Sequence, residues 1–424
     1  MKLHIKGGRL IDPRNQIDRQ EDLCLAEGRV VAVGKKPHDF DADRIIDADG
    51  KIVCPGLIDL CARLNPLESE LAAAVAGGVS TIVCPPDTDP PLDEPELVER
   101  LVHHAAEARA ARVLPLGALT VGLAGELLSE MFGLSQAGCV GFSQAKTPIH
   151  NTENLRRAML YAATFDYMLW LVPKDPYIGA QGVAHDGEVA FRLGLPVSPV
   201  SAEHIAVSTL LILAAETGVR MHLGNISTAA GMRLIRSARS EGLPVSCDVS
   251  IYNLLMSDTD IGYFDTAARF EPPLRSKHDM NALQDAVVDG VAVLCSDHTP
   301  LFEDDKLLPF ATAGAGASGL ELLLPLTLAW ASERGLPLRK SIACLTDKPS
   351  TVLGQAGSDI GDLGVGQYAD ACIIDPRKVW EVNAETLLSC GKNTPWQGRS
   401  VSGRVVTTIV GGEVVYENQA LCAW

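Results

Sequence analysis

The chain has 424 residues and is 47% hydrophobic, which is enough for one large domain and a smaller one, since domains usually contain about 100 to 250 residues. Its 53 acidic and 36 basic side chains give a net charge of -17, which argues against nucleic acid or an anionic membrane surface as a partner. No apolar run of about 18 residues and no signal-peptide pattern is present. The 11 cysteines are scattered singly, as in a reducing compartment, so we expect a cytoplasmic protein.

Short alternating strands and turn dipeptides fill the first part of the chain, from Leu3 to Gly50. From Cys54 to about Leu353, short β-branched apolar runs alternate with segments of helical period, which is typical of βα units around a parallel sheet. The eight runs are Ile52 to Arg63, Val79 to Asp87, Arg112 to Thr120, Gly138 to Gln144, Tyr167 to Asp175, Val219 to Ser227, Pro244 to Ser250 and Ala292 to Asp297. This pattern predicts an α/β fold with a (β/α)8 TIM barrel.

The last part of the chain, from about Ile360 to Glu417, again has short strands and turns. Neither end is long enough for a core of its own. We therefore predict that residues 1–53 and 358–424 pair into one small composite β-sandwich, and that residues 54–357 form the barrel.

Several motifs resemble those of one enzyme family. The run from Pro55 to Leu60 resembles the opening strand of the amidohydrolase superfamily, which continues with His-x-His. The segments Gly391 to Trp396 and Ser402 to Val406 are similar to the closing segments of bacterial dihydroorotases, and Pro272 to Arg275 and Ser296 to Pro300 match the same family. The resemblance implies a metal-dependent hydrolase type of barrel, in which one or two zinc ions activate a water for attack on dihydroorotate.

The metal-ligand positions implied by this resemblance have changed. The His-x-His pair, whose side chains share one face of a strand, is Cys61 and Arg63 here. Arg63 is always protonated and would repel a cation by about 4 kcal/mol per pair of unit charges at an effective dielectric of 20. The remaining ligand positions carry, in chain order, Gln144, Val172, Asn225 and Asp297. Since only Asp297 matches the family, we expect the zinc site to be lost, with no metal, no cofactor and no catalytic residue.

The substrate-binding positions implied by the resemblance differ as well. They carry Asn65, Asp87 and Glu271, and the two carboxylates would repel an anionic substrate. Two histidines lie close to ligand positions. His222 lies three residues before Asn225, so regular strand alternation predicts that it faces the helices, and His298 should face away from its neighbour Asp297.

The losses are selective, because the strand pattern and the turn glycines are intact. The chain is similar to the non-catalytic dihydroorotase-like subunits, or pseudo-dihydroorotases, that associate with aspartate carbamoyltransferase. This resemblance implies a catalytically inactive assembly subunit in de novo pyrimidine biosynthesis, with the aspartate carbamoyltransferase catalytic chain as partner and self-association.

The residues leave two alternative functions open. One is a weakly active or altered-specificity amidohydrolase that uses Asp297, or Cys61 with a thiol pKa lowered by Arg63. The other is a sensor that binds a metabolite in the barrel mouth.

Overall fold

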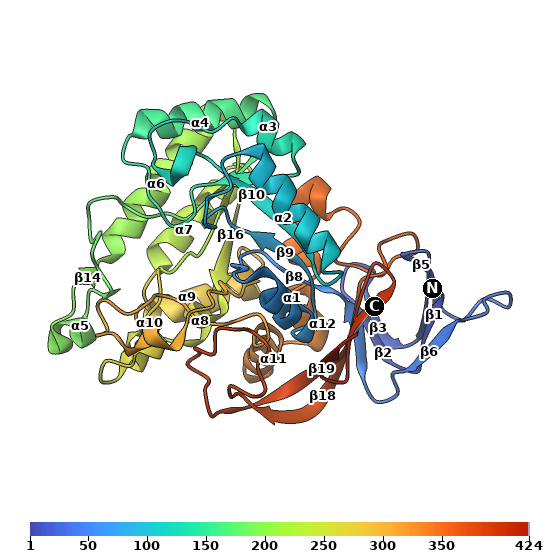
Figure 1. Cartoon of the computed structure of the whole chain (residues 1–424). Helices are drawn as coiled ribbons and strands as arrows, with labels where there is room; N and C mark the ends of the chain where they lie inside the picture. Colours follow the sequence, from blue (N-terminus) through green and yellow to red (C-terminus); the bar gives the residue numbers. More distant parts are fainter. Residues whose placement is uncertain (423–424) are drawn as a thin grey trace.

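The computed structural model describes residues 1–422. It contains an eight-stranded parallel sheet in the order β17-β16-β15-β12-β11-β10-β9-β8; β8, β9, β10 and β16 are labelled in Figure 1. The strands are β8 (Leu57–Asp59), β9 (Val79–Cys84), β10 (Arg112–Ala118), β11 (Gly141–Ser143), β12 (Met168–Leu171), β15 (Arg220–Leu223), β16 (Val245–Ser250) and β17 (Val293–Cys295). Each of the eight predicted runs contains one of them. The predicted (β/α)8 barrel is confirmed.

The first and last strands of the barrel meet through backbone and side-chain contacts. Ala62 and His298 form an isolated parallel bridge, and the Arg63 N–H donates to the His298 carbonyl over 3.0 Å. The Asp59 carboxylate accepts a 2.9 Å hydrogen bond from the Ser296 N–H. These contacts bring the residues that follow β8 and β17 to the same point of the barrel rim.

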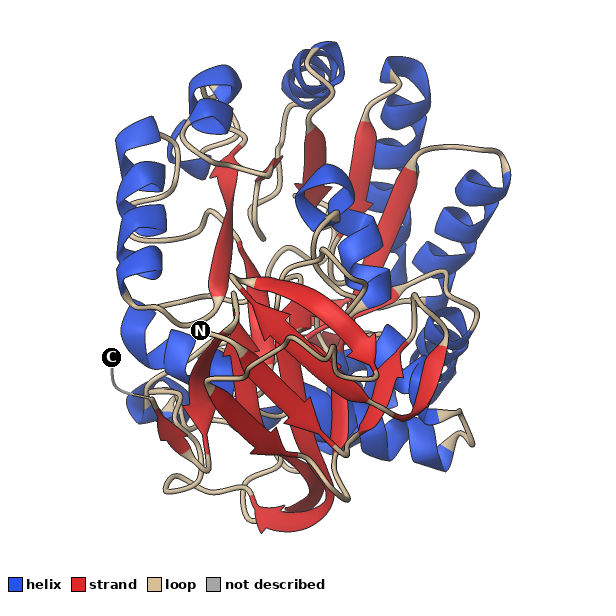
Figure 2. Ribbon diagram, turned by 90° about the vertical axis from the view of Figure 1, so that its right-hand side faces the viewer, coloured by secondary structure: helices blue, strands red, loops and turns tan. Residues whose placement is uncertain are grey.

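Helices surround the barrel strands (Figure 2). They are α1 (Leu67–Ala76), α2 (Pro95–Glu107), α3 (Met131–Gln136), α4 (Thr152–Thr164), α5 (Glu188–Leu193), α6 (Val200–Thr217), α7 (Ala229–Ser240), α8 (Ile251–Leu255), α9 (Lys277–Val288), α10 (Glu303–Leu307), α11 (Leu323–Glu333), α12 (Leu338–Ala343) and α13 (Asp347–Leu353). A pair of two-residue strands, β13 (Ala184–His185) and β14 (Val197–Ser198), flanks α5. Among the described residues, α6 alone is long and apolar enough to cross a membrane, but it packs between α4 and α7 as a barrel helix.

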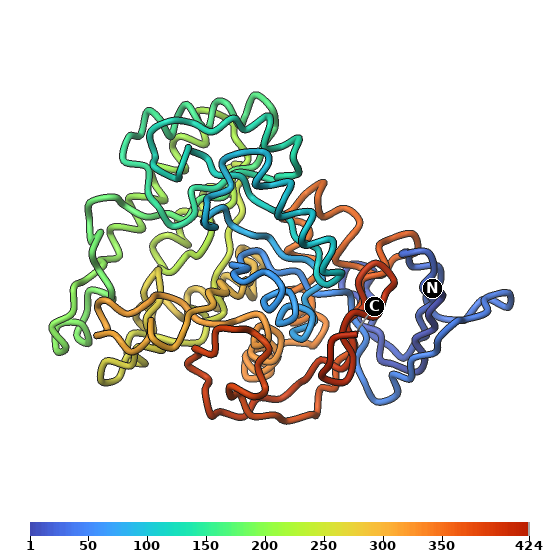
Figure 3. The backbone as a smooth tube through the Cα atoms, in the orientation of Figure 1, coloured from blue at the N-terminus to red at the C-terminus, as the bar shows by residue number. Residues whose placement is uncertain are grey.

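Both ends of the chain build a second group of strands beside the barrel, where the blue and red ends run together (Figure 3). One sheet, in the order β5-β4-β1-β6, contains β1 (Leu3–Lys6), β4 (Asp22–Ala26), β5 (Arg29–Gly34) and β6 (Arg44–Asp47). The other, in the order β21-β20-β19-β18-β7-β2-β3, contains β2 (Arg9–Asp12), β3 (Ile17–Gln20), β7 (Ile52–Pro55), β18 (Ala371–Glu381), β19 (Ser400–Val410), β20 (Glu413–Glu417) and β21 (Ala420–Leu421). Antiparallel pairing of Cys54 in β7 with Cys372 in β18 joins the two ends.

The chain passes from this sheet into the barrel at Gly56, between β7 and β8. A Cβ atom on Gly56 would lie 2.3 Å from the Ser80 Oγ and 3.2 Å from the Asp370 Cβ. Only glycine fits at such a close approach. The Pro-Gly-Leu motif therefore marks the point where the chain leaves one sheet and enters the other.

Candidate functional site

Charged side chains from three strand ends meet at the mouth of the barrel, around Asp297. Its carboxylate accepts hydrogen bonds from the Lys146 Nζ at 2.9 Å, the Arg63 Nη1 at 3.3 Å and the Cys61 Sγ at 3.6 Å. Asp297 has a positive φ of 47° just beyond β17 and is 4% exposed. A buried carboxylate needs such cationic partners, because an isolated charge in the interior is strongly destabilising.

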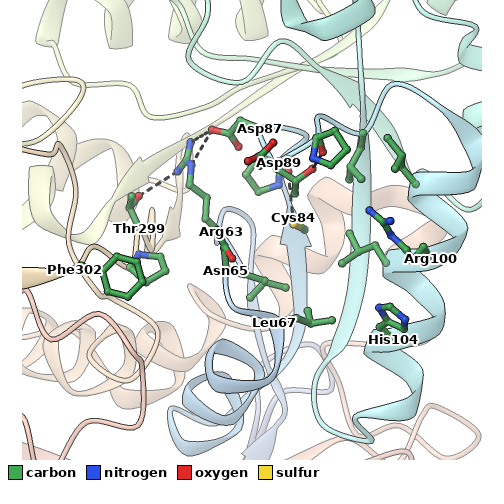
Figure 4. A pocket seen from close by; sticks show the side chains of 18 of the residues that line it. Arg63, Asn65, Leu67, Cys84, Asp87, Asp89, Arg100, His104, Thr299 and Phe302 are labelled. Atoms are coloured by element: carbon green, nitrogen blue, oxygen red, sulfur yellow. Dashed lines mark hydrogen bonds and ion pairs between the residues drawn. The ribbon is translucent and has the colours of Figure 1, made fainter. Parts of the chain in front are cut away.

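Arg63 connects this cluster to a cavity beside the mouth. Its guanidinium donates to the Thr299 Oγ1 at 3.2 Å and pairs with Asp87, at 2.9 Å from Nε and 2.8 Å from Nη2 (Figure 4). The cavity has a volume of about 450 Å³ and is lined by Arg63, Asn65 and Asp87, together with residues of α2 and of the segment after β17. Two of the three substrate-binding positions that the resemblance implies therefore line one cavity with Arg63.

Lys146 is the group at this site that the sequence analysis missed. It lies two residues beyond Gln144, and Ala145 between them has a positive φ of 50°, which turns the chain at the end of β11. The only available signal was a lysine directly after a predicted barrel strand. Its direction depends on the conformation of Ala145, which strand alternation does not predict.

The other altered ligand positions are Gln144, Asn225 and Val172, and the polar side chains among them interact with neighbouring residues of the barrel. The Gln144 side chain accepts from the Thr120 Oγ1 at 2.9 Å and donates to the Leu123 carbonyl at 2.7 Å. The Asn225 Nδ2 lies 3.8 Å from the Cys295 Sγ. Val172 lines two smaller cavities of about 180 Å³ and 50 Å³ on the side of the mouth formed by β12. Within residues 1–422, the side-chain hydrogen bonds of the Asp297 carboxylate go to Cys61, Arg63 and Lys146 and not to these three residues.

The carboxylates at the implied substrate positions are both compensated by cations. Asp87 pairs with Arg63, and Glu271 pairs with Lys174, whose Nζ lies 2.5 Å from the Glu271 Oε1. Burial raises the pKa of Glu271, but Lys174, together with Lys146 and Arg269, lowers it, and the net effect is a lowered pKa. Asp297 is matched by Lys146 in the same way. Each of these three carboxylates therefore has a cationic partner, so none of them is an uncompensated negative charge at the mouth.

The two histidines near ligand positions, His222 and His298, form hydrogen bonds with buried residues of the barrel. The His222 ring lies 4.3 Å from the Trp170 ring and bonds to the Ser246 Oγ at 2.8 Å and to the Asp248 carboxylate at 2.9 Å. Trp170 belongs to the apolar cluster inside the barrel, so the prediction that His222 faces the helices is wrong. The strand ends at Leu223, and a positive φ of 53° at Asn225 breaks the alternation on which that prediction relied.

His298 points away from the mouth. Its Nε2 pairs with the Glu70 carboxylate at 2.8 Å, and its Nδ1 accepts from the Gly319 N–H at 3.0 Å.

The thiol of Cys61 is unsuited to nucleophilic attack. Burial and the neighbouring Asp297 raise its pKa well above the usual value, and the opposing effects of Arg63 and Lys146 are smaller. The hypothesis that Arg63 activates this thiol is wrong, because the guanidinium is already paired with two carboxylates.

The comparisons with known proteins decide the family. The profile described as "Amidohydrolase family" matches residues 201–415, and the profile "Dihydro-orotase-like" matches residues 50–230. A "Dihydroorotase-like protein" of Pseudomonas aeruginosa is 38% identical over 98% of this chain and 100% of its own length. The chain belongs to the dihydroorotase-like amidohydrolases.

Other members of the amidohydrolase family carry enzyme names. A "Dihydroorotase" of Syntrophotalea carbinolica is 37% identical over 98% of this chain and 99% of its own length. The structure of an L-hydantoinase (dihydropyrimidinase) from Arthrobacter aurescens superposes with a TM-score of 0.88 and 26% identity, over 99% of this chain and 97% of that one. The expectation that this amidohydrolase is not an enzyme is therefore wrong, because relatives along its whole length are named as hydrolases.

The expectation of no cofactor is contradicted by the same relatives, since amidohydrolases typically depend on a metal ion, usually zinc. The donors at the mouth of this amidohydrolase do not fit that ion. Residues 1–422 contain no group of three or more His, Cys, Asp or Glu side chains that could hold a metal. Asp297 is bound by Lys146 and Arg63, and neither cation can serve as a ligand while protonated.

Proposed function

We propose that the chain is a hydrolase with altered specificity that opens or closes a cyclic amide, and that Asp297 is its proton acceptor. One observation carries this proposal: a buried carboxylate at the end of the last barrel strand, flanked by Lys146 and Arg63, beside a cavity of about 450 Å³. Barrel enzymes place their reactive groups at the carboxyl ends of the strands. The names of the relatives, dihydroorotase and hydantoinase, support a cyclic ureide as the substrate.

The chemistry assigns a task to each charged group. Water adds to the ring carbonyl, Asp297 accepts one proton from it, and the same proton passes to the ring nitrogen as the C–N bond breaks. The ammonium of Lys146 lies beside Asp297 and would stabilise the negative charge that develops on the carbonyl oxygen. The second proton of the water stays on the new carboxyl group and is then released to solvent. The products are therefore a carboxylate, an open-chain N–H group and one proton, so atoms and charges balance.

The charge balance of the mouth favours a neutral ring over an anionic one. Arg63 and Lys174 are already paired with Asp87 and Glu271, so no unpaired cation of this set is left for a substrate carboxylate. We therefore expect hydantoin and dihydrouracil to be better substrates than dihydroorotate.

Ring opening of these three compounds by the purified protein tests the proposal, with and without added Zn²⁺ and after treatment with a chelator. Asp297→Asn and Lys146→Met should each lower kcat/KM by about a hundredfold or more, because general bases and oxyanion donors contribute factors of that order. Asp289→Asn is the matched control, since Asp289 is an exposed aspartate paired with Arg236. Absence of turnover under all conditions, or full activity of Asp297→Asn, contradicts the proposal.

We also propose that this hydrolase works in the cytoplasm in association with the catalytic chain of aspartate carbamoyltransferase, and that it associates with itself. An exposed aromatic surface supports a protein partner. Phe191 of α5 is 90% exposed, and Tyr263, which follows the 3-10 turn Asp258–Ile261, is 88% exposed. The helix α5 packs beside this turn, so both rings lie on neighbouring elements at one end of the barrel.

Co-purification with the transferase chain tests this association. Replacing both Phe191 and Tyr263 by serine should reduce the recovered complex severalfold, because exposed aromatic side chains are frequent interface anchors. Val365→Ser is the control, since Val365 is 69% exposed but belongs to the segment that precedes β18. Failure of the unmodified chain to bind the transferase, or equal recovery of the double variant, argues against this partner or this surface.

A further inference from the structure

A further cavity, similar in volume to the one beside Arg63, lies at the opposite end of the barrel from Asp297, where the strands begin. It has a volume of about 440 Å³ and is lined by Met168, Arg220, Val245 and Val293, which begin β12, β15, β16 and β17 or directly adjoin their first residues. Asp297 follows the other end of β17. The two cavities are therefore separated by the length of the barrel strands, and an occupant of one leaves the other free.

The charge of this cavity is opposite to the charge of the whole chain. Its lining contains Arg220, Arg239 and Lys348 but no aspartate or glutamate, although the chain carries a net charge of -17. The three cations come from β15, α7 and α13. Such a concentration of one sign of charge in a concave site attracts an anion of the opposite sign.

Two of these cations have only neutral partners. The Arg239 Nη1 donates to the Val291 carbonyl at 2.5 Å, and the Lys348 Nζ donates to the Val287 carbonyl at 3.2 Å. Arg220 pairs with Asp166 at 2.8 Å, but the Asp166 side chain is 82% exposed. Its Nη2 also donates to the Asp166 carbonyl at 2.5 Å. A solvent-exposed ion pair of this kind is weak, so Asp166 competes only weakly with an incoming anion for Arg220.

The remaining lining is largely apolar. Met168, Leu243, Val291 and Val352 contribute side chains to it. Gly290 and Gly354 lie beside Lys348 and Arg220 and have positive φ angles of 74° and 58°, which favour glycine at both positions. An anionic group and an attached apolar ring would both find complementary surfaces here.

We propose that this cavity at the start of the barrel strands binds a phosphorylated small metabolite. Arg220, Arg239 and Lys348 hold its phosphate, and its ring lies against the apolar wall. Guanidinium groups match the oxygens of a phosphate in bidentate geometry, and a lysine adds a point charge. The volume is sufficient for a mononucleotide-sized ligand. This site is independent of the reaction at the barrel mouth.

Isothermal titration of the full chain at low ionic strength tests the site with AMP, inorganic phosphate and malonate as probes. AMP and phosphate should bind, and AMP should bind more tightly because of its ring. The double substitution Arg239→Gln and Lys348→Gln should weaken the binding of both at least tenfold. Arg233→Gln, which removes the same charge from an exposed position of α7 outside the cavity, should change the dissociation constant less than twofold.

Three results overturn the proposal: no binding of AMP or phosphate, unchanged binding by the double variant, or malonate binding as tightly as phosphate. The last result would assign the site to carboxylates. Thermal unfolding of each variant, and the single variant Arg239→Gln, separate loss of the site from loss of the fold.

Discussion

At the scale of single residues, the buried carboxylate of Glu70 makes the stability of the fold depend on pH. The side chains of Glu70 and His298 are both fully buried, the Glu70 Oε2 and the His298 Nε2 lie 2.8 Å apart, and the Cys390 N–H donates to the other Glu70 oxygen at 2.9 Å. Burial alone would raise the pKa of Glu70, but His298 and the hydrogen bonds around the carboxylate lower it to about 2. A carboxyl group with a lowered pKa stabilises the fold above its unfolded pKa, and this contribution disappears as the pH falls.

We predict that Glu70→Gln removes this pH-dependent contribution. Between pH 5 and pH 2 the free energy of unfolding of the unmodified chain should fall by about 3 kcal/mol more than that of the variant, since each pKa unit corresponds to about 1.4 kcal/mol. Urea denaturation at a series of pH values measures both proteins. Parallel pH profiles would mean that the pKa of Glu70 is not lowered by its partners.

Some residues of the candidate site could be predicted from the sequence, and others could not. The changed positions around Cys61, Arg63 and Asp297 are readable in the motifs, and the structure brings these three side chains together. Lys146 and the inward direction of His222 are not readable, because positive φ angles at Ala145 and Asn225 end the regular alternation of the strands. The pairing of Asp87 and Glu271 with cations depends on contacts between distant segments, which sequence spacing does not give.

At the scale of elements, several barrel helices begin with a side-chain cap. Asn151 precedes α4, and its side chain accepts a 2.9 Å hydrogen bond from the Glu153 N–H. Asn151 is exposed, so a substitution there changes little besides the helix terminus.

We predict that Asn151→Ala lowers the free energy of unfolding by about 1 kcal/mol, because the first N–H groups of a helix have no partner within the helix. Asn151→Asp is the matched control, since aspartate caps as well as asparagine and should leave stability nearly unchanged. Chemical denaturation of the three proteins under identical conditions measures the difference. Equal losses in both variants would mean that the amide group has another function.

The eight barrel strands are predictable because each lies in a short, mostly apolar run between helical segments; in β9, for example, all six residues are buried. The segment β13-α5-β14, between barrel strands β12 and β15, could not be predicted, because strands of two residues are too short to show an alternating pattern in the sequence. The pairing of β7 with β18 follows only from the need of both chain ends for a shared core.

At the scale of the whole molecule, Arg14 links the first strands to the end of the barrel. It pairs with Asp347 of α13 and with Asp362, both at 2.8 Å, and also donates to the Ser350 hydroxyl. Asp362 is nearly fully buried.

We predict that Arg14→Met destabilises the protein by about 2 kcal/mol, because removal of one partner leaves a buried charge without compensation, and partial exposure of Arg14 reduces the effect. Arg19→Met is the control, since Arg19 pairs with Glu21 in an exposed position and should contribute less than about 0.5 kcal/mol. Thermal and urea unfolding measure both variants. A loss no larger than that of the control would show that Arg14 does not hold the two parts together.

The shared sheet of the two chain ends has a consequence for synthesis on the ribosome. Cys54 leaves the exit tunnel roughly 320 residues before its partner Cys372. The edge of β7 that pairs with β18 therefore stays unpaired while the whole barrel is translated. An unpaired apolar strand edge readily joins other chains. Truncation before Ala371 should therefore give an aggregating product instead of a free barrel, and the nascent chain is a natural client for chaperones until its last strands emerge.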